Sequence, residues 1–369
     1  MKKLFTLAAA TALVSLALGA RAQITLDGKV DAAEIATTTT ANKYTLVSSY
    51  TGTHSQAGLG LQSLYVGAST TKLYIAVVGA FEQSNGSYPA VIGYLNLPNK
   101  TGVAAGTKLA GGNAGDSPLQ QKPTMDFEVD YGLRINFAPT GNANAYISYV
   151  DYTAGNPTGG APDTYQGNPN KSGTPVTASA TTGPFAGWRV AYLTAGTVTT
   201  NTANAGVEFE FDLTNMGLTS TSVLNMFFAY TQDKGVFTSD TFPPITGQTA
   251  ALQPDQDFTA IPGRQVLTYQ LGTGALATRL ADATALGLSV YPNPAAGTSS
   301  IAYQVADAAT PVTVSLTDLL GRTVRVLESG VKPVGRQSAS LNTAALAAGT
   351  YLVRVQVGDR IATSKVAVL

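Results

Sequence analysis

Two short runs of the sequence alternate acidic with apolar residues, and their carboxylates are the side chains best suited to bind a metal ion. The acids are Asp126, Glu128 and Asp130 in the first run and Glu208, Glu210 and Asp212 in the second. Residues two apart on a strand share one face, so each run predicts a row of three carboxylates. Like charges in a row repel unless a cation or a basic residue offsets them. Ca²⁺, which binds about six to eight oxygen ligands, suits such a row.

The same rows have a second interpretation that needs no metal. The carboxylates can lie on solvated strand faces and pair with basic residues such as Arg134 and Arg189. A weaker Ca²⁺ candidate is the Pro-Asp-Gln-Asp sequence that holds Asp255 and Asp257. The sequence therefore offers Ca²⁺ as a cofactor and leaves its presence open.

Aromatic side chains suggest a different chemistry, the stacking of sugar rings. Trp188 is the only tryptophan and immediately precedes an apolar strand, so we expect it in the core. Tyr88, Tyr152 and Tyr165 lie in polar, glycine-rich stretches and are better candidates for a ligand-binding surface. Tyrosine also suits a half-exposed β surface without any ligand, and this alternative stays open.

Residues for most kinds of catalysis are missing. His54 is the only histidine and lies in a polar Thr-Gly-Thr-His-Ser sequence, where we expect it to be exposed; there is no cysteine. Neither a G-x-S-x-G nucleophile motif nor a Walker or dinucleotide glycine motif occurs. A glycosidase that needs only two carboxylic acids remains, but the acids here fall on regular strands rather than in a cleft. The sequence therefore predicts a protein that is not an enzyme.

The elements expected to position these residues are almost all β-strands. Apolar or alternating runs bounded by Gly, Pro, Asn and Ser recur along the chain. They cover 72–78, 90–97, 126–137, 145–152, 188–193, 207–213, 223–230 and 266–271. Two turn-rich stretches, 99–123 and 153–184, are expected to be loops that are too polar to contribute to a core.

Composition narrows the class of protein further. Charged residues make up only 12% of the 369 residues, and the net charge is zero. Such chains suit extracellular β-proteins, whose strands favour Thr and Tyr and whose turns favour Gly and Asn. No strongly basic face is predicted, so nucleic acid is not an expected partner.

The N-terminus has the pattern of a secretory signal peptide. Lys2 and Lys3 precede an apolar run from Leu4 to Gly19, and Ala20-Arg21-Ala22 supplies a cleavage site. We expect residues 1–22 to be removed on export. No later apolar run approaches the length of a membrane span, so the mature chain is predicted to have no transmembrane segment.

The C-terminal residues predict a separate small β-domain. Residues 273–287 are poor in strand-forming residues and indicate a linker. Val312, Val314 and Leu316 then share one strand face, as do Tyr351, Val353, Val355 and Val357 on another strand. About 80 residues suffice for a small immunoglobulin-like sandwich of six or seven strands.

Four short motifs within residues 288–369 occur in the order and spacing of a known family. They are Tyr291-Pro292-Asn293-Pro294, the Gly321-Arg322 turn, Gly349-Thr350-Tyr351 and the terminal strand that begins at Lys365. Together they resemble the C-terminal sorting domain that the type IX secretion system of Gram-negative bacteria recognises. The resemblance implies a tail that is recognised at the outer membrane and is commonly removed or exchanged for a surface anchor. The alternative is an ordinary immunoglobulin-like domain.

The region from residue 23 to 272 carries a weaker resemblance. Its opening, Ile24 to Glu34, has an apolar-Asp-Gly-x-x-Asp-x-x-Glu pattern, with Ile35 where a tryptophan usually follows. This pattern, together with 72–77 and 206–218, resembles family 9 carbohydrate-binding modules and related DOMON-like β-sandwiches. The resemblance implies a β-sandwich and an extracellular polysaccharide as a partner.

The sequence thus predicts an all-β protein with a large N-terminal sandwich and a small C-terminal one. We expect it to be secreted or displayed at the cell surface by way of the periplasm, with the type IX machinery as a partner. Glycan binding by the N-terminal region is the first functional hypothesis. A structural surface or matrix protein without a small ligand is the second.

Overall fold

The computed structural model describes residues 24–36, 42–272, 286–305, 310–318, 323–344, 346–357 and 360–369. The predicted signal peptide and nearly all of the predicted linker lie outside these residues. The described part is almost wholly β, as the sequence predicts, with every named pair of strands antiparallel and only short 3₁₀ turns as helices. None of the described helices is long and apolar enough to cross a membrane.

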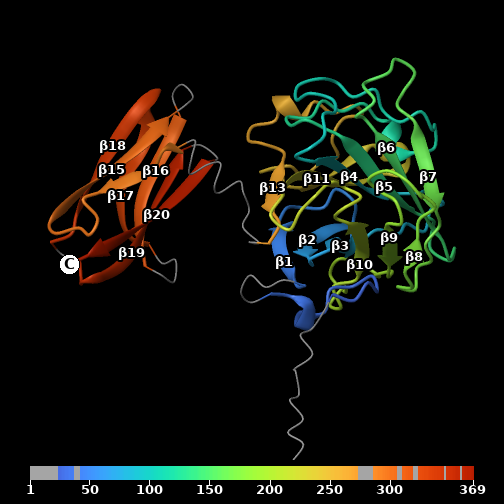
Figure 1. The fold of residues 1–369 in the computed structure, drawn as a ribbon, viewed down its shortest axis with the longest axis horizontal. Coiled ribbons are helices and arrows are strands. Elements are labelled where there is room, and N and C mark those ends of the chain that lie inside the picture. The colour runs from blue at the N-terminus through green and yellow to red at the C-terminus, as the bar shows by residue number, and fades with distance from the viewer. Residues whose placement is uncertain are drawn as a thin grey trace, which may run out of the picture.

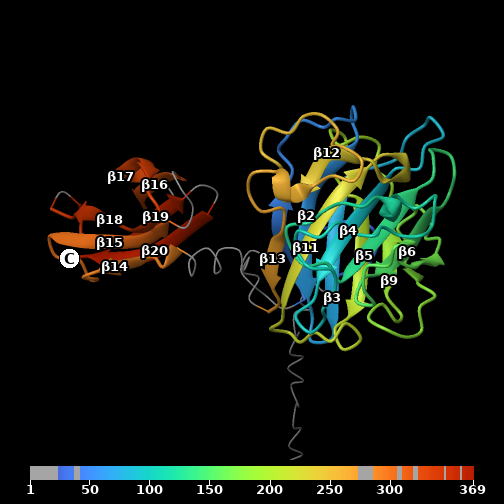
Figure 2. The same cartoon turned by 90° about the horizontal axis from the view of Figure 1, so that it is seen from above.

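Two stacked sheets form the N-terminal sandwich, as Figures 1 and 2 show. The first contains, in spatial order, β1 (Tyr44–Ser49), β2 (Gly60–Ala68), β3 (Lys72–Ala80), β10 (Gly206–Asp212), β9 (Arg189–Tyr192) and β8 (Val176–Thr177). The second contains β12 (Phe237–Phe242), β11 (Val223–Thr231), β4 (Ala90–Asn96), β5 (Tyr131–Phe137), β6 (Ala145–Asp151) and β7 (Asp163–Gly167), and β13 (Leu267–Gln270) pairs with β11. Because successive side chains of a strand point to opposite faces, each sheet offers one face to the other and one outward.

The core between the two sheets is aliphatic at one part and aromatic at another. Trp188 lies within it, 1% exposed, as expected from the sequence. Its ring stacks on Phe209 and Phe211 with centroids 6.0 and 5.5 Å away, and Phe185 packs beside it. Such aromatic packing adds to the free energy gained from burial alone.

A second apolar cluster covers much of the outer face of the second sheet. Ile92, Tyr94 and Val150 point outward from their strands and meet side chains from the loops above. Val103, Leu109 and Leu119 come from the stretch 99–123, and all three are buried. The prediction that this stretch contributes no core residue is therefore wrong. The stretch 153–184 likewise holds β7, β8 and the buried residues Ala161 and Ala178.

The C-terminal residues form a smaller sandwich of seven strands. One sheet contains β14 (Ser289–Tyr291), β15 (Thr298–Val305) and β18 (Gly335–Asn342), and the other contains β17 (Thr323–Lys332), β16 (Thr310–Thr317), β19 (Gly349–Val357) and β20 (Arg360–Val368). Val314, Leu316, Val353 and Val355 are fully buried between them, as the alternation predicts. All members of this core lie between Leu286 and Val366.

Candidate functional site

The outer face of the second sheet carries a row of polar and aromatic side chains on three neighbouring strands. Arg134 of β5 lies opposite Ser148 of β6, which in turn lies opposite Tyr165 of β7. Two residues along, Asn136 of β5 lies opposite Tyr146 of β6. The residues between them, including Ile135 and Ile147, point into the sandwich core. The register therefore gathers this row on the outward face.

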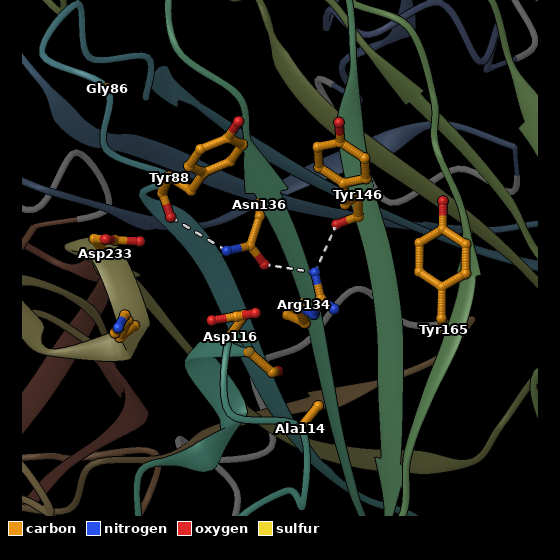
Figure 3. A pocket seen from close by; sticks show the side chains of 11 residues that line it. Gly86, Tyr88, Ala114, Asp116, Arg134, Asn136, Tyr146, Tyr165 and Asp233 are labelled. Atoms are coloured by element: carbon orange, nitrogen blue, oxygen red, sulfur yellow. Dashed lines mark hydrogen bonds between the residues drawn. The ribbon is translucent and has the colours of Figure 1, made fainter.

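This row forms one wall and the floor of a pocket of about 510 Å³. Loops complete it: Tyr88 precedes β4, Asp116 and Ser117 precede the 3₁₀ turn η2 (Pro118–Gln120), and Asp233 and Lys234 belong to η3 (Asp233–Gly235). Figure 3 shows Arg134 and Asn136 near the centre, with the three tyrosine rings and the acidic residues around them. The arrangement is open to a ligand with both apolar faces and polar groups.

Three tyrosines line the pocket, two of them among the predicted ligand-binding residues. Tyr88 is 37% and Tyr165 is 53% exposed, and Tyr146 is half-buried. The rings of Tyr88 and Tyr146 have centroids 6.3 Å apart and planes inclined at 46°. The third predicted tyrosine, Tyr152, is not part of the site: it is fully buried in the outer cluster of the second sheet.

Hydrogen bonds hold the floor of the pocket rigid. Arg134 Nε donates to Ser148 Oγ at 2.6 Å, and Nη1 donates to Asn136 Oδ1 at 2.7 Å and to the Tyr146 carbonyl at 3.3 Å. Asn136 Nδ2 donates to the Tyr88 carbonyl at 3.2 Å, which ties the loop to the sheet. Burial lowers the pKa of the Arg134 guanidinium. The floor is therefore set before any ligand arrives.

The loops of the rim are also anchored. Ser117 caps η2 by accepting the Leu119 amide, and Leu119 itself is fully buried. Gln121 Nε2 donates to the Lys234 carbonyl at 2.9 Å, which joins η2 to η3. Asp116 and Asp233 are exposed at this rim. The pocket thus has a half-buried cation on its floor and mixed charges at its edge.

The acidic row lies on β10, as the sequence predicts, but its carboxylates form ion pairs and hydrogen bonds with other residues of the protein. Glu210 lies 3.3 Å from Arg189 and 3.9 Å from Lys72, and Asp212 lies 3.5 Å from Lys72. Glu208 is buried and accepts the Tyr44 hydroxyl at 2.7 Å. The alternative of pairing with a basic residue holds for Glu210 and Arg189, but Glu208 and Glu210 are buried and do not lie on a solvated face. Arg134 has no part in this pairing.

Glu208 also holds the opening of the chain against the first sheet. It accepts the amides of Asp27 and Gly28 at 2.8 and 2.7 Å. Gly28 has a φ of +81°, and a Cβ there would clash with the backbone of Leu193. Glu34, the last acid of the opening pattern, accepts the Thr25 and Asp31 amides at 2.6 and 3.0 Å. These residues therefore build a structural clasp.

The other acidic run does not form the predicted strand face, because β5 starts only at Tyr131. Each of its three acids accepts a hydrogen bond from a different backbone amide. Asp126 accepts Gln265 N at 2.5 Å, Glu128 accepts Gly102 N at 3.2 Å, and Asp130 accepts Leu97 N at 2.6 Å. Burial raises the pKa of Asp130 to about 6. The run fixes loops to the sheet.

Asp255 and Asp257 likewise have separate protein partners. Asp255 accepts the Lys122 amide at 2.6 Å and lies 3.1 Å from Lys108 Nζ, and these contacts lower its pKa. Asp257 caps a 3₁₀ turn by accepting Thr259 N at 2.9 Å. Across the described ranges, no group of three or more His, Cys, Asp or Glu residues is arranged to hold a metal ion.

His54, like Tyr152, does not lie where the sequence predicts it. Its side chain is only 22% exposed, and Nδ1 lies 2.5 Å from Oδ2 of Asp240, which is 1% exposed. Asp240 also accepts Leu61 N at 2.9 Å and Ser239 Oγ at 2.7 Å. The pair is 186 residues apart in sequence, and no local pattern signals it. Ser239 bonds the carboxylate rather than the imidazole, so this is not the geometry of a nucleophilic triad.

Three of the four tail motifs meet around its last strand, where β19 pairs with β20. Asn293 Nδ2 donates to the Lys365 carbonyl at 2.8 Å, and Asn293 Oδ1 accepts Ala367 N at 3.0 Å. β14 ends at Tyr291, and β19 begins at Gly349. Tyr351 Oη donates to the Ala347 carbonyl at 3.0 Å. Gly321 and Arg322 lie outside the described residues.

Comparisons of the whole chain with solved structures give matches of low sequence identity and low TM-score. No curated protein matches the sequence. Latent PorU from Porphyromonas gingivalis is 11% identical over 81% of this chain, with a TM-score of 0.20. PorZ of the type IX secretion system of the same organism is 14% identical over 81% of the chain, with a TM-score of 0.17. The BSP domain of a biofilm associated protein is 9% identical over 93%, also with a TM-score of 0.17.

This chain matches only part of each of those longer chains. A family model matches its C-terminal tail. The chain covers 31% of the PorU chain, 43% of the PorZ chain and 54% of the BSP-domain chain. Residues 289–369 match the secretion system C-terminal sorting domain. This tail indicates that the protein is exported to the cell surface or the medium.

Proposed function

We propose that residues 24–272 form a non-enzymatic extracellular module that binds a glycan chain in the tyrosine-lined pocket. The observation that carries this proposal is the gathering of Tyr88, Tyr146 and Tyr165 around a cavity of about 510 Å³. The hydrogen-bonded floor of Arg134 and Asn136 lies between them.

Carbohydrate recognition needs two kinds of surface at once. The C–H face of a pyranose ring packs on an aromatic ring, and its hydroxyls need polar partners at fixed positions. The rings supply the first surface. Arg134, Asp116 and Asp233 supply donors and acceptors around it. The rigidity of the floor limits the entropy that binding would cost.

The position of the pocket suits a polymer. It lies on the outer face of the second sheet and reaches β7, which ends that sheet. Tyr165 and Thr164 of β7 are exposed. A chain can therefore extend from the sugar that the pocket holds past this edge of the sheet.

Binding rather than hydrolysis is proposed from the carboxylates at hand. A glycosidase needs one carboxylic acid that stays protonated and a second that is ionised on the opposite side of the bond. Burial in an apolar site is the usual means of keeping the first one protonated. The two acids that line this pocket, Asp116 and Asp233, are both exposed.

The test is a glycan array probed with the mature protein and with Tyr146→Ala, Tyr165→Ala and Thr164→Ala. Thr164 is the matched control, because it is exposed on the same strand but does not line the pocket. We expect the tyrosine variants to weaken binding about tenfold and the control to bind as the parent does. If no glycan binds the parent protein, the structural surface or matrix role replaces this proposal.

A further inference from the structure

The guanidinium of Arg134 has unused hydrogen-bonding capacity that faces the pocket. An arginine carries five N–H donors. One hydrogen on Nε and the two on Nη1 are taken by Ser148, Asn136 and the Tyr146 carbonyl. Among the described residues no acceptor is paired with Nη2. This nitrogen is not among the fully buried side-chain atoms that lack a partner, so it is not completely sealed from solvent.

Arg134 also lacks the carboxylate that the enclosed Lys171 has. The Lys171 side chain, only 9% exposed, lies 2.9 Å from Glu82. No carboxylate of the described ranges lies within 4.0 Å of the Arg134 guanidinium. Its charge is therefore held in a half-buried place with neutral partners only, and an unpaired charge in such a place costs free energy.

The other charges near the pocket do not supply Arg134 with an ion-pair partner. Asp163 of β7 is the acid whose charge acts on Arg134, but it lies beyond ion-pair distance, and both its carboxylate oxygens are buried without a donor. Asp116, Asp233 and Lys234 are exposed at the rim, where water screens them. An anion that reached the floor would meet the Nη2 hydrogens in a half-buried part of the pocket.

We propose that the pocket recognises an acidic sugar, with the carboxylate of a uronic acid residue bound by Arg134 Nη2 and its ring held among Tyr88, Tyr146 and Tyr165. The inference rests on the proposed glycan-binding function and adds the class of glycan. A charge-assisted hydrogen bond of this kind is stronger than a neutral one. A neutral sugar offers Arg134 only a hydroxyl oxygen and leaves the cation without a carboxylate at ion-pair distance.

The decisive experiment compares the same polysaccharide backbone with and without its carboxylate charges. Oligogalacturonides and oligomannuronates are each measured by calorimetry against their carboxyl-reduced forms, which keep the linkage and lose only the carboxylate. We expect the acidic form to bind at least about tenfold more tightly. We expect this preference to shrink as salt is raised, because a charged contact at a half-open site is partly screened.

Two variants assign the preference to Arg134. Arg134→Gln should lose the preference, whereas Arg189→Gln, which changes an arginine of the other sheet, should keep it. Thermal melts of both variants check that they fold. The comparison between acidic and reduced ligands is made on the parent protein and therefore stands even where a variant fails to fold.

Each other outcome has a distinct meaning. Equal binding of acidic and reduced chains overturns the acidic-sugar inference and leaves glycan binding intact. A preference for sulfated over carboxylated chains overturns the carboxylate assignment. A preference that survives in Arg134→Gln overturns the role of Arg134. Binding of no glycan at all overturns the proposed function as well.

Discussion

Glu208 is a single residue whose ionisation should govern part of the stability of the N-terminal sandwich. Burial raises its pKa from 4.5 to about 7, although hydrogen bonds from Tyr44, Asp27 and Gly28 oppose that shift. Since the folded protein holds this proton more tightly than the unfolded chain does, ionisation costs stability. The loss builds up between about pH 4.5 and pH 7 and is complete above that, at about 3 kcal/mol.

Glu208→Gln removes the ionisation and keeps an oxygen that can accept a hydrogen bond. We expect the free energy of unfolding of the parent protein to fall between pH 5 and pH 8 more steeply than that of the variant, by up to about 3 kcal/mol. Urea unfolding at four pH values measures this. Glu210→Gln on the same strand is the control, and equal slopes for parent and Glu208→Gln would contradict the prediction.

The pair of His54 and Asp240 joins the loop before β2 to β12. Removal of the imidazole leaves a carboxylate that is 1% exposed with fewer partners. We expect His54→Ala to cost about 1–3 kcal/mol of stability. In a double-mutant cycle with Asp240→Asn, the two effects should not add, because each variant removes the same contact. Additive losses, measured by denaturant unfolding, would show that the contact contributes little.

At the scale of elements, strands with an apolar or alternating run could be predicted, and those without such a run could not. The expected strands at 72–78 and 207–213 are confirmed as β3 and β10, whose side chains alternate between two faces. β12, Phe-Thr-Ser-Asp-Thr-Phe, is wholly buried, so its polar residues give no amphipathic signal. The stretch 99–123 buries apolar residues at irregular spacings, which no periodic pattern reveals.

The same dependence on local sequence patterns explains which pocket residues could be predicted. Tyr88 and Tyr165 stand out because their neighbours are polar. Tyr146 was missed because it belongs to a regular alternating strand, and the pocket lies on the outward face of that strand. Tyr152 was misplaced because a loop covers it, and Leu119 of that loop comes from far along the sequence. Long-range contacts of this kind have no local signature.

Leu119 links the outer apolar cluster to the rim of the pocket. Leu119→Ala should leave a cavity beneath η2 and cost about 2–5 kcal/mol of stability. Because η2 and η3 are joined through Gln121 and Lys234, we also expect weaker glycan binding. Leu46→Ala, at a leucine that is 47% exposed, is the control for a lost leucine side chain. A drop in melting temperature without any change in glycan affinity would contradict the predicted link between the cluster and the rim of the pocket.

At the scale of the whole molecule, the two sandwiches have separate cores. Among the described residues, the tail core draws on residues from Leu286 onward, and the clusters of the N-terminal sandwich draw on residues from Ile24 to Leu271. Deletion of residues 286–369 should therefore leave the N-terminal melting transition unchanged. In a host with type IX machinery, the shortened protein should remain in the periplasm. Its appearance in the medium at the parent level would refute the sorting role of the tail.

Lys365 allows a finer test of that role. Its side chain is exposed, whereas its neighbour Val366 is fully buried. Lys365→Ala should therefore fold normally, and we expect it to lower export if the machinery recognises this strand. Cell fractionation and thermal melts, compared with Thr363→Ala on the same strand, measure the two effects. Normal export of Lys365→Ala would place recognition elsewhere in residues 289–369.

The two faces of β5 have separate roles, and this separation affects how the protein could acquire new binding specificities. Leu133, Ile135 and Phe137 belong to the inner core, while Arg134 and Asn136 between them belong to the pocket. Substitutions at the second set can change what the surface recognises while the packing that keeps the chain folded stays as it is. A bacterium could thus adapt this exported scaffold to a new polysaccharide through a few codons, and an engineer could do so with a small library.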